Sequence, residues 1–208
     1  MTQESSIRIK DRDITRFIIL DLEGTLEITE LSAVITDAQF TVIDKIQIFC
    51  ENKIIDREIF EKYVSRKYGR FNLDKLFLET CVPFQEALKK FDVFLKKNLS
   101  DHKFMFMTCG FWDLNKQIPK QCLKMGIEKP QYFNWFVNIK KVFESVFKIE
   151  SEGMDHMLYY LNIQLDGNHH CAIDDCLNLA KLMKEIHKKI INDELYPNNH
   201  YRVCKSRF

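Results

Sequence analysis

The first quarter of the chain combines apolar and β-branched residues in the pattern of strands. Four apolar residues at 17–20 lead into Asp21-Leu22-Glu23-Gly24-Thr25. Further apolar segments follow, in which residues such as Val42, Ile46 and Ile48 are β-branched. Segments of this kind between polar breaks favour β-structure. The pattern predicts strands at about 16–22, 27–35 and 40–50, arranged as an antiparallel opening to the fold.

The middle of the chain changes to the period of helices. Residues 54–68 predict a helix that ends at Gly69, a residue type favoured after a helix C-terminus. Pro83 suits the first turn of a second helix, whose apolar residues recur at the i, i+3, i+4, i+7 spacing of a buried face. The short apolar segment 103–108 then predicts a buried strand, which a parallel crossover would add to the sheet. The apolar face of the second helix comprises Phe84, Ala87, Leu88, Phe91, Phe94 and Leu95.

The second half of the chain predicts mainly helices. One helix should begin near Asp113 and be kinked or broken by Pro119. Asn134 is expected to cap a helix that buries Phe136, and Ser151 to cap the next one. A last helix is expected over about 171–191, and residues 196–208 show no periodicity. Three antiparallel strands followed by helix–strand–helix units predict an α/β, ribonuclease-H-like mixed sheet with helices on both faces, although other three-layer α/β folds fit the pattern too.

Composition places these elements in one globular domain. Of the 208 residues 46% are hydrophobic and 29% are charged, which is typical of a folded chain with one core. We expect a flexible lead-in over 1–15, one domain over 16–195 and a C-terminal tail over 196–208. The formal net charge is +1, so any affinity for nucleic acid has to come from local patches.

Cysteine usage and hydropathy indicate an intracellular protein. The seven cysteines are odd in number and contain no C-x-x-C pair, which favours free thiols in a reducing compartment such as the cytoplasm or nucleus. No apolar run approaches the roughly 18 residues of a membrane span. The N-terminus is polar and lacks the features of a signal peptide. We therefore expect no membrane association.

Acids at the ends of two predicted strands are candidates for chemistry. Asp21 and Glu23 project from one face of a strand, about 7 Å apart along it. Carboxylates held this close repel each other unless a proton or a cation lies between them. Asp113 follows the buried strand 103–108, and ligands of open α/β sheets gather at the carboxyl ends of strands. A plain helix N-cap would also explain Asp113.

A second group of candidates begins the last predicted helix. The adjacent acids Asp174 and Asp175 point about 100° apart on a helix, so only one of them can face a given site. His170 precedes them on a polar loop, a suitable position for a mobile acid–base group. A zinc site among the neighbouring histidines and cysteines is disfavoured, because their spacing matches no usual template.

Together these segments resemble the three motifs of the DEDDh (DnaQ-like) 3′→5′ exonuclease superfamily. The motifs are Asp21-x-Glu23, Gly110-Phe111-Trp112-Asp113 and His170-x4-Asp175, in order and at fitting intervals between about 17 and 191. The nearest likeness is to the exoribonucleases that include the histone-mRNA 3′ exonuclease and the enhanced-RNAi exonuclease. The resemblance implies metal ligands at Asp21, Glu23, Asp113 and Asp175, a general base at His170 and a supporting partner at Asn178.

The resemblance also implies the chemistry. Carboxylate ligands suit Mg²⁺ or Mn²⁺, and two such ions about 3.5–4 Å apart would hold an attacking water and the leaving 3′-oxygen in line. Histidine, with an ordinary pKa of about 6.5, is suited to accept the proton of that water at neutral pH. The reaction would release nucleoside 5′-monophosphates from the 3′ end of single-stranded RNA or of RNA 3′ overhangs, with DNA as a further candidate.

The chain departs from the family in two places. Gly24 stands where members usually carry Ala, which looks like a small change. The Leu-Thr-Gly-Ile segment, which in the family helps to hold the terminal nucleotide, has its nearest counterpart in Lys67-Tyr68-Gly69-Arg70. There Tyr68 is suited to stack on a base and Arg70 to contact a phosphate. Further candidates for substrate binding are Trp112, Lys116, Lys140 and Lys141.

Two other functions fit parts of the pattern. The segment 21–26 also resembles the first motif of haloacid-dehalogenase-like phosphatases, with Asp21 as nucleophile and Thr108 as second motif. Those phosphatases need Asp where Glu23 stands, and this interpretation leaves Asp113 and His170 without roles. A non-catalytic RNA-binding or scaffold protein with the nuclease fold would show the loss of a metal acid, and none is lost. We therefore adopt the exonuclease interpretation.

Overall fold

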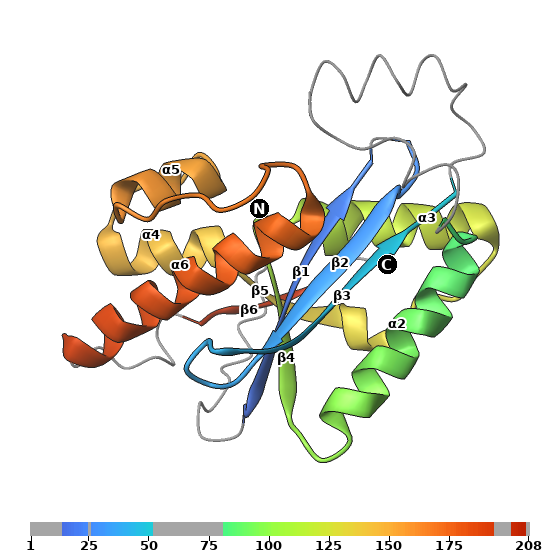
Figure 1. The fold of residues 1–208 in the computed structure, drawn as a ribbon, viewed down its shortest axis with the longest axis horizontal. Coiled ribbons are helices and arrows are strands. Elements are labelled where there is room, and N and C mark those ends of the chain that lie inside the picture. Colours follow the sequence, from blue (N-terminus) through green and yellow to red (C-terminus); the bar gives the residue numbers. More distant parts are fainter. Residues whose placement is uncertain (1–13, 25, 52–80, 194–200, 207–208) are drawn as a thin grey trace.

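Six strands of the described part of the chain form one mixed sheet at the centre of the molecule (Figure 1). The computed structural model describes residues 14–24, 26–51, 81–193 and 201–206. The helix expected at 54–68 and the substrate-binding candidates Tyr68 and Arg70 lie outside these described residues. The order across the sheet is β3-β2-β1-β4-β5-β6, with β1 at its centre.

Strand directions confirm the predicted plan of an antiparallel opening followed by parallel crossovers. β1 (Arg16–Glu23) pairs antiparallel with β2 (Glu30–Thr36), and β2 pairs antiparallel with β3 (Val42–Phe49). On the other side of β1, β4 (Phe104–Thr108) is parallel to it and β5 (Trp135–Asn138) is parallel to β4. The last strand at this edge of the sheet is β6 (Val203–Lys205), which is antiparallel to β5.

Helices cover both faces of this sheet (Figure 1). α2 (Phe84–Leu99) and α3 (Ile118–Met125) lie on one face, and α4 (Ile139–Phe147), α5 (Met154–Tyr160) and α6 (Ala172–Asn192) lie on the other. No helix in the described ranges is long and apolar enough to cross a membrane.

Alternation along β1 determines which layer each of its side chains meets. Ile18 and Leu20 pack in the core beneath α2, whereas Phe17 and Ile19 pack in the core beneath α6. Because side chains alternate faces, Asp21 and Glu23 continue the second series. The two acids therefore lie at the carboxyl end of β1, on the face that α6 covers.

The prediction that a helix starts at Asn134 is wrong, because the helix starts at Ile139. Residues 131–134 form a 3₁₀ turn, residues 135–138 form β5, and α4 begins at 139. The N-cap is Asn138, whose side chain accepts the N–H of Lys140 at 3.0 Å. Phe136 is buried in the strand, opposite Phe106 of β4. Pairing with two neighbouring strands thus overrides a local pattern that suits a helix.

Two smaller expectations about helix ends also change. The N-cap of α5 is Gly153 and not Ser151, whose hydroxyl donates to the Gly153 carbonyl at 3.4 Å. Near Pro119 the helix does not stop: the π-helical turn η3 (Asp113–Gln117) passes into α3, with the proline in the first turn of α3. A proline has no N–H to donate, and the wider π turn before it accommodates the ring.

Candidate active site

Three acids from two ends of the chain meet above β1. Asp21, Glu23 and Asp175 each offer a carboxylate oxygen within 4.8 Å of the others. Asp21 and Glu23 come from the end of β1, and Asp175 from the first turn of α6, which packs against β1 and β2. Glu23 and Asp175 are buried. The structure therefore brings three of the four acids implied by the resemblance into one cluster.

The fourth acid, Asp113, is placed by the strand next to β1. Because β1 and β4 are parallel, their carboxyl ends lie at the same edge of the sheet, and Asp113 begins η3 just beyond β4. The intervening turn is fixed by two contacts: the Thr108 hydroxyl donates to the Gly110 carbonyl at 2.8 Å, and the Gly110 N–H donates to Asn138 Oδ1 at 3.1 Å. Asp113 is buried, and its negative charge raises the pKa of Asp21.

Asp174 and Asp175 point to different surroundings, as expected for adjacent helical residues. Asp175 Oδ2 accepts the backbone N–H of His170 at 2.9 Å, within the acid cluster. Asp174 Oδ2 instead accepts the N–H of Asn168 at 2.9 Å, and a Cβ on Gly167 would come within 2.4 Å of that oxygen. Asp174 therefore holds the loop before α6, while Asp175 contributes to the site.

The supporting role expected of Asn178 takes a different form in the structure. Its side chain accepts the N–H of Asp166 at 3.0 Å, and its amide donates to the carbonyls of Asp166 at 2.8 Å and Asp174 at 2.9 Å. Asp166 also pairs with Lys181. Asn178 thus clamps the loop that carries His170, rather than a carboxylate of the cluster.

His170 lies beside Asp175 in an uncommon backbone conformation. Its φ is +69°, in the left-handed region that residues other than glycine rarely adopt. Its ring stacks on that of His169, with centroids 4.0 Å apart and planes 8° apart. Nitrogens of both rings lie within 4.8 Å of an Asp175 oxygen. The loop therefore holds an imidazole at the edge of the acid cluster.

Burial raises the pKa values of Asp21, Asp113 and Asp175, and neighbouring negative charges add to the rise for Asp21 and Asp175. The pKa of Asp21 lies well above its ordinary value, because of burial first and then of the charges of Asp113, Glu23, Asp175 and Glu30. Burial raises the pKa of Asp113 to about 7 and that of Asp175 to about 7, although the His170 N–H favours the Asp175 carboxylate. The folded chain without a cation therefore holds protons that the unfolded chain would release.

The donor set fits a divalent cation. Asp175 Oδ1 is buried and has no hydrogen-bond partner among the described residues, and a cation would satisfy it. Hard carboxylate oxygens without sulfur ligands suit Mg²⁺ or Mn²⁺. Cys109 adds nothing to the set, because burial and the nearby acids raise the pKa of its thiol and keep it protonated.

The raised pKa values predict how stability depends on pH and metal. With folded pKa values near 7 for Asp113 and Asp175 against about 4 when unfolded, the metal-free protein should lose stability as pH rises between these limits. Divalent cation should restore it, by about 2.7 kcal/mol at a hundred times the dissociation constant. Melting temperatures measured at about pH 5 and about pH 8, with excess MgCl₂ or EDTA, test this. A metal-induced rise no larger at the higher pH would contradict it.

Candidate substrate contacts fall into two groups. Trp112 is 60% exposed and Lys116 is exposed, and both flank the buried Asp113 on η3 and the turn before it. Lys140 and Lys141 on α4 instead have intramolecular partners, the carbonyl of Glu152 at 3.0 Å and the carboxylate of Glu144 at 2.6 Å. Trp112 and Lys116 are therefore exposed and close to Asp113 in the sequence, whereas Lys140 and Lys141 contact groups of the chain itself.

Gly24, expected to be a neutral change from Ala, is required by the loop after β1. Its φ is +121°, and a Cβ would come within 2.0 Å of the Glu27 carbonyl oxygen. The tight loop is held from the α3 side: Gln117 donates to the Gly24 carbonyl at 2.7 Å, and Lys124 pairs with Glu27 at 2.7 Å. The tight loop therefore depends on a glycine at position 24, because a side chain there would collide with the backbone.

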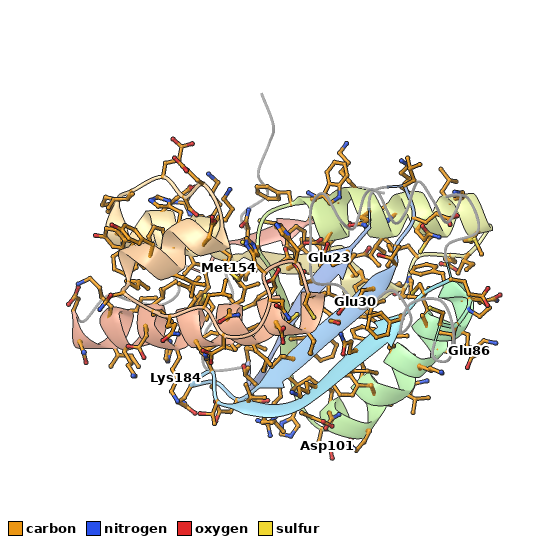
Figure 2. The ribbon with its side chains drawn as sticks, turned by 45° about the horizontal axis from the view of Figure 1, so that its top comes forward. Glu23, Glu30, Glu86, Asp101, Met154 and Lys184 are labelled. Atoms are coloured by element: carbon orange, nitrogen blue, oxygen red, sulfur yellow. The ribbon has the colours of Figure 1, made fainter. Side chains whose placement is uncertain are left out.

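Sequence reasoning missed one buried acid near the site, Glu30. It opens β2 directly opposite Glu23 in the strand register, and Figure 2 shows the two residues on neighbouring strands at the same end of the sheet. Its pKa is raised, mainly by burial. An acid at an inward position of a predicted strand is the signal that could have identified it.

The fold and local contacts also bear on the phosphatase alternative. Thr108 is fully buried, and its hydroxyl is engaged with the Gly110 carbonyl. β1 has an antiparallel neighbour in β2, as expected for the ribonuclease-H-like plan. The phosphatase interpretation leaves two residues without roles: Asp113, whose charge raises the pKa of Asp21, and His170, whose N–H donates to Asp175. These placements favour the nuclease interpretation.

Comparison with known proteins identifies relatives over most of the chain. An exonuclease domain-containing protein of Arabidopsis thaliana is 32% identical over 190 residues, which cover 86% of this chain and 56% of that protein. Human ERI1 exoribonuclease 3 is 35% identical over 106 residues, which cover 49% of this chain and 32% of that protein. The chain thus spans about half the length of the first relative and about a third of the second.

Solved structures and a family model give the same assignment. The nuclease domain of 3′hExo, a DEDDh family member bound to rAMP, shares the fold with a TM-score of 0.77 at 22% identity, over 93% of this chain and 98% of that one. A family model described as "Exonuclease" matches residues 17–183, from β1 into α6 and through all three motifs. The chain therefore belongs to the exonuclease (RNase T) family.

Proposed function

We propose that the chain is a metal-dependent 3′→5′ exoribonuclease with Asp21, Glu23, Asp113 and Asp175 as metal ligands and His170 as general base. The observation that carries the proposal is the convergence of Asp21, Glu23 and Asp175 within 4.8 Å, with His170 bonded through its backbone to Asp175. Family membership supports the reaction class. The name of the human relative, an exoribonuclease, supports RNA as the substrate.

The acid cluster would hold two Mg²⁺ or Mn²⁺ ions. When bound, such ions neutralise the charge of the phosphodiester and of the departing 3′-oxygen. Bound cations would also offset the burial and the neighbouring negative charges that raise the pKa of Asp21 in the metal-free chain. The unpartnered Asp175 Oδ1 provides one of the oxygens for this purpose.

The residues of the chain supply proton transfer and substrate binding. His170 accepts a proton from a water molecule as the water oxygen bonds to phosphorus, and the bond from phosphorus to the 3′-oxygen of the preceding nucleotide breaks. The products are a nucleoside 5′-monophosphate and an RNA one nucleotide shorter. Trp112 stacks on a base and Lys116 contacts a phosphate, beside Asp113. Tyr68 and Arg70 serve the terminal nucleotide in the same way.

The assay for this function uses 5′-labelled single-stranded RNA with Mg²⁺ or Mn²⁺. We expect a ladder of products shortened from the 3′ end and release of 5′-monophosphates, both abolished by excess EDTA. A 5′-labelled DNA of the same sequence measures sugar preference, and p-nitrophenyl phosphate with Mg²⁺ serves as the phosphatase control. A ladder that persists in EDTA would exclude the metal-dependent reaction, and hydrolysis of p-nitrophenyl phosphate alone would favour the phosphatase.

A further inference from the structure

Glu30 is a fully buried acid that the proposed reaction does not use. It is 0% exposed and lies at the start of β2, opposite Glu23 (Figure 2). Three neutral groups donate hydrogen bonds to its Oε1: the Ser32 hydroxyl at 2.8 Å, the Gln47 amide at 2.9 Å and the Ile173 N–H at 3.3 Å. Burying a carboxyl group that has only neutral partners is unfavourable. We therefore expect Glu30 to have a role beyond packing.

The contact with Ile173 joins β2 to the first turn of α6. The Ile173 N–H belongs to that first turn, so the Glu30 carboxyl group contacts the start of the helix from the sheet. The N-cap of α6, Cys171, forms no side-chain capping bond of its own. Glu30 thus acts as the N-terminal cap that Cys171 does not provide. Its carboxyl group lies at the positive end of the dipole of α6.

We propose that Glu30 is a positioning residue that fixes the start of α6 to the sheet and thereby holds Asp175 within ligand distance of Asp21 and Glu23. Asp175 follows Ile173 by two residues in the same turn. A shift of that turn would carry Asp175 away from the two acids of β1 while leaving those acids in place. This inference rests on the proposed function, because it assigns Glu30 to the assembly of that metal site.

The experiment compares Glu30→Ala and Glu30→Asp with Glu30→Gln, which keeps an oxygen at the same reach. Thr36→Val, at the far end of β2, is the control for loss of a buried polar group on the same strand. Three quantities are measured for each variant: Mn²⁺ affinity by electron paramagnetic resonance, the Mg²⁺ concentration for half-maximal activity and the KM for RNA. Hydrogen exchange of the peptide over the first turn of α6 reports its anchorage directly.

We expect Glu30→Ala and Glu30→Asp to weaken Mn²⁺ binding and raise the Mg²⁺ requirement by about 10–100-fold, as is typical when the support of a metal ligand is lost. Exchange in the first turn of α6 should speed up, KM should stay the same, and Glu30→Gln should recover most of the affinity. Thr36→Val should alter none of these quantities.

Three outcomes would overturn the inference. They are unchanged Mn²⁺ affinity in Glu30→Asp, equal losses in Thr36→Val, and a Glu30→Gln variant as impaired as Asp21→Asn, which would make Glu30 a ligand. If Glu30→Ala does not fold, the Asp and Gln variants still decide the question. If the wild-type chain binds no Mn²⁺, the proposed function fails instead, whereas normal wild-type binding with unaffected variants rejects Glu30 alone.

Discussion

Asp175→Asn is expected to reduce RNA degradation to background, whereas Asp174→Asn should retain most of it. Asp175 contributes an oxygen to the cluster with Asp21 and Glu23, and its Oδ1 has no other partner among the described residues. An amide removes one negative charge and one anionic ligand from a site that depends on both. The side chain of Asp174 instead accepts the N–H of Asn168, a bond that an asparagine oxygen can also accept. Initial rates on 5′-labelled RNA at saturating Mg²⁺ measure the difference.

The pair provides its own control, because both changes remove one charge from the same turn of α6. Asp21→Asn should match Asp175→Asn, since both residues contribute to the cluster. In the absence of metal, Asp175→Asn should melt no lower than the wild type, because it removes a repelling acid whose pKa burial raises. Equal losses of activity in Asp174→Asn and Asp175→Asn would mean that the wrong face of the helix has been assigned to the site.

The acids of the site could be predicted because each follows a strong local signal. Asp21 and Glu23 end a run of four apolar residues, and their shared face follows from the alternation of a strand. Asp175 stands at the start of a helix of 21 residues with one apolar face, which local periodicity locates well. The choice of Asp175 over Asp174 came from the family motif and not from geometry, since the helix allows either.

The features that the local sequence pattern failed to predict depend on residues far away in the sequence or on the folded backbone. Residues 135–138 are a strand because β4 and β6 lie on either side, and β6 itself has only three residues. Glu30 meets the N–H of Ile173 across 143 residues, a contact that no periodicity encodes. The constraint on Gly24 likewise arises from a close approach to the Glu27 carbonyl, which only the folded loop reveals. Tertiary pairing and backbone approach set these features.

His170→Ala is expected to lower kcat by about 10²–10⁴-fold, the range typical for loss of a general base, with little change in the KM for RNA. The imidazole lies within 4.8 Å of an Asp175 oxygen, at the edge of the acid cluster. The bond that joins this loop to Asp175 uses the backbone N–H of residue 170, which alanine retains. Metal affinity should therefore persist while proton transfer is lost. Single-turnover rates and Mn²⁺ binding, measured on the same variant, separate the two effects.

The positive φ of His170 requires a second variant, because alanine is strained in the left-handed region. His170→Asn suits that conformation better and should be as inactive as His170→Ala if the imidazole itself is needed. His169→Ala removes the stacked neighbour and should leave kcat within a few-fold of the wild type. Full activity in His170→Asn would place the general base elsewhere.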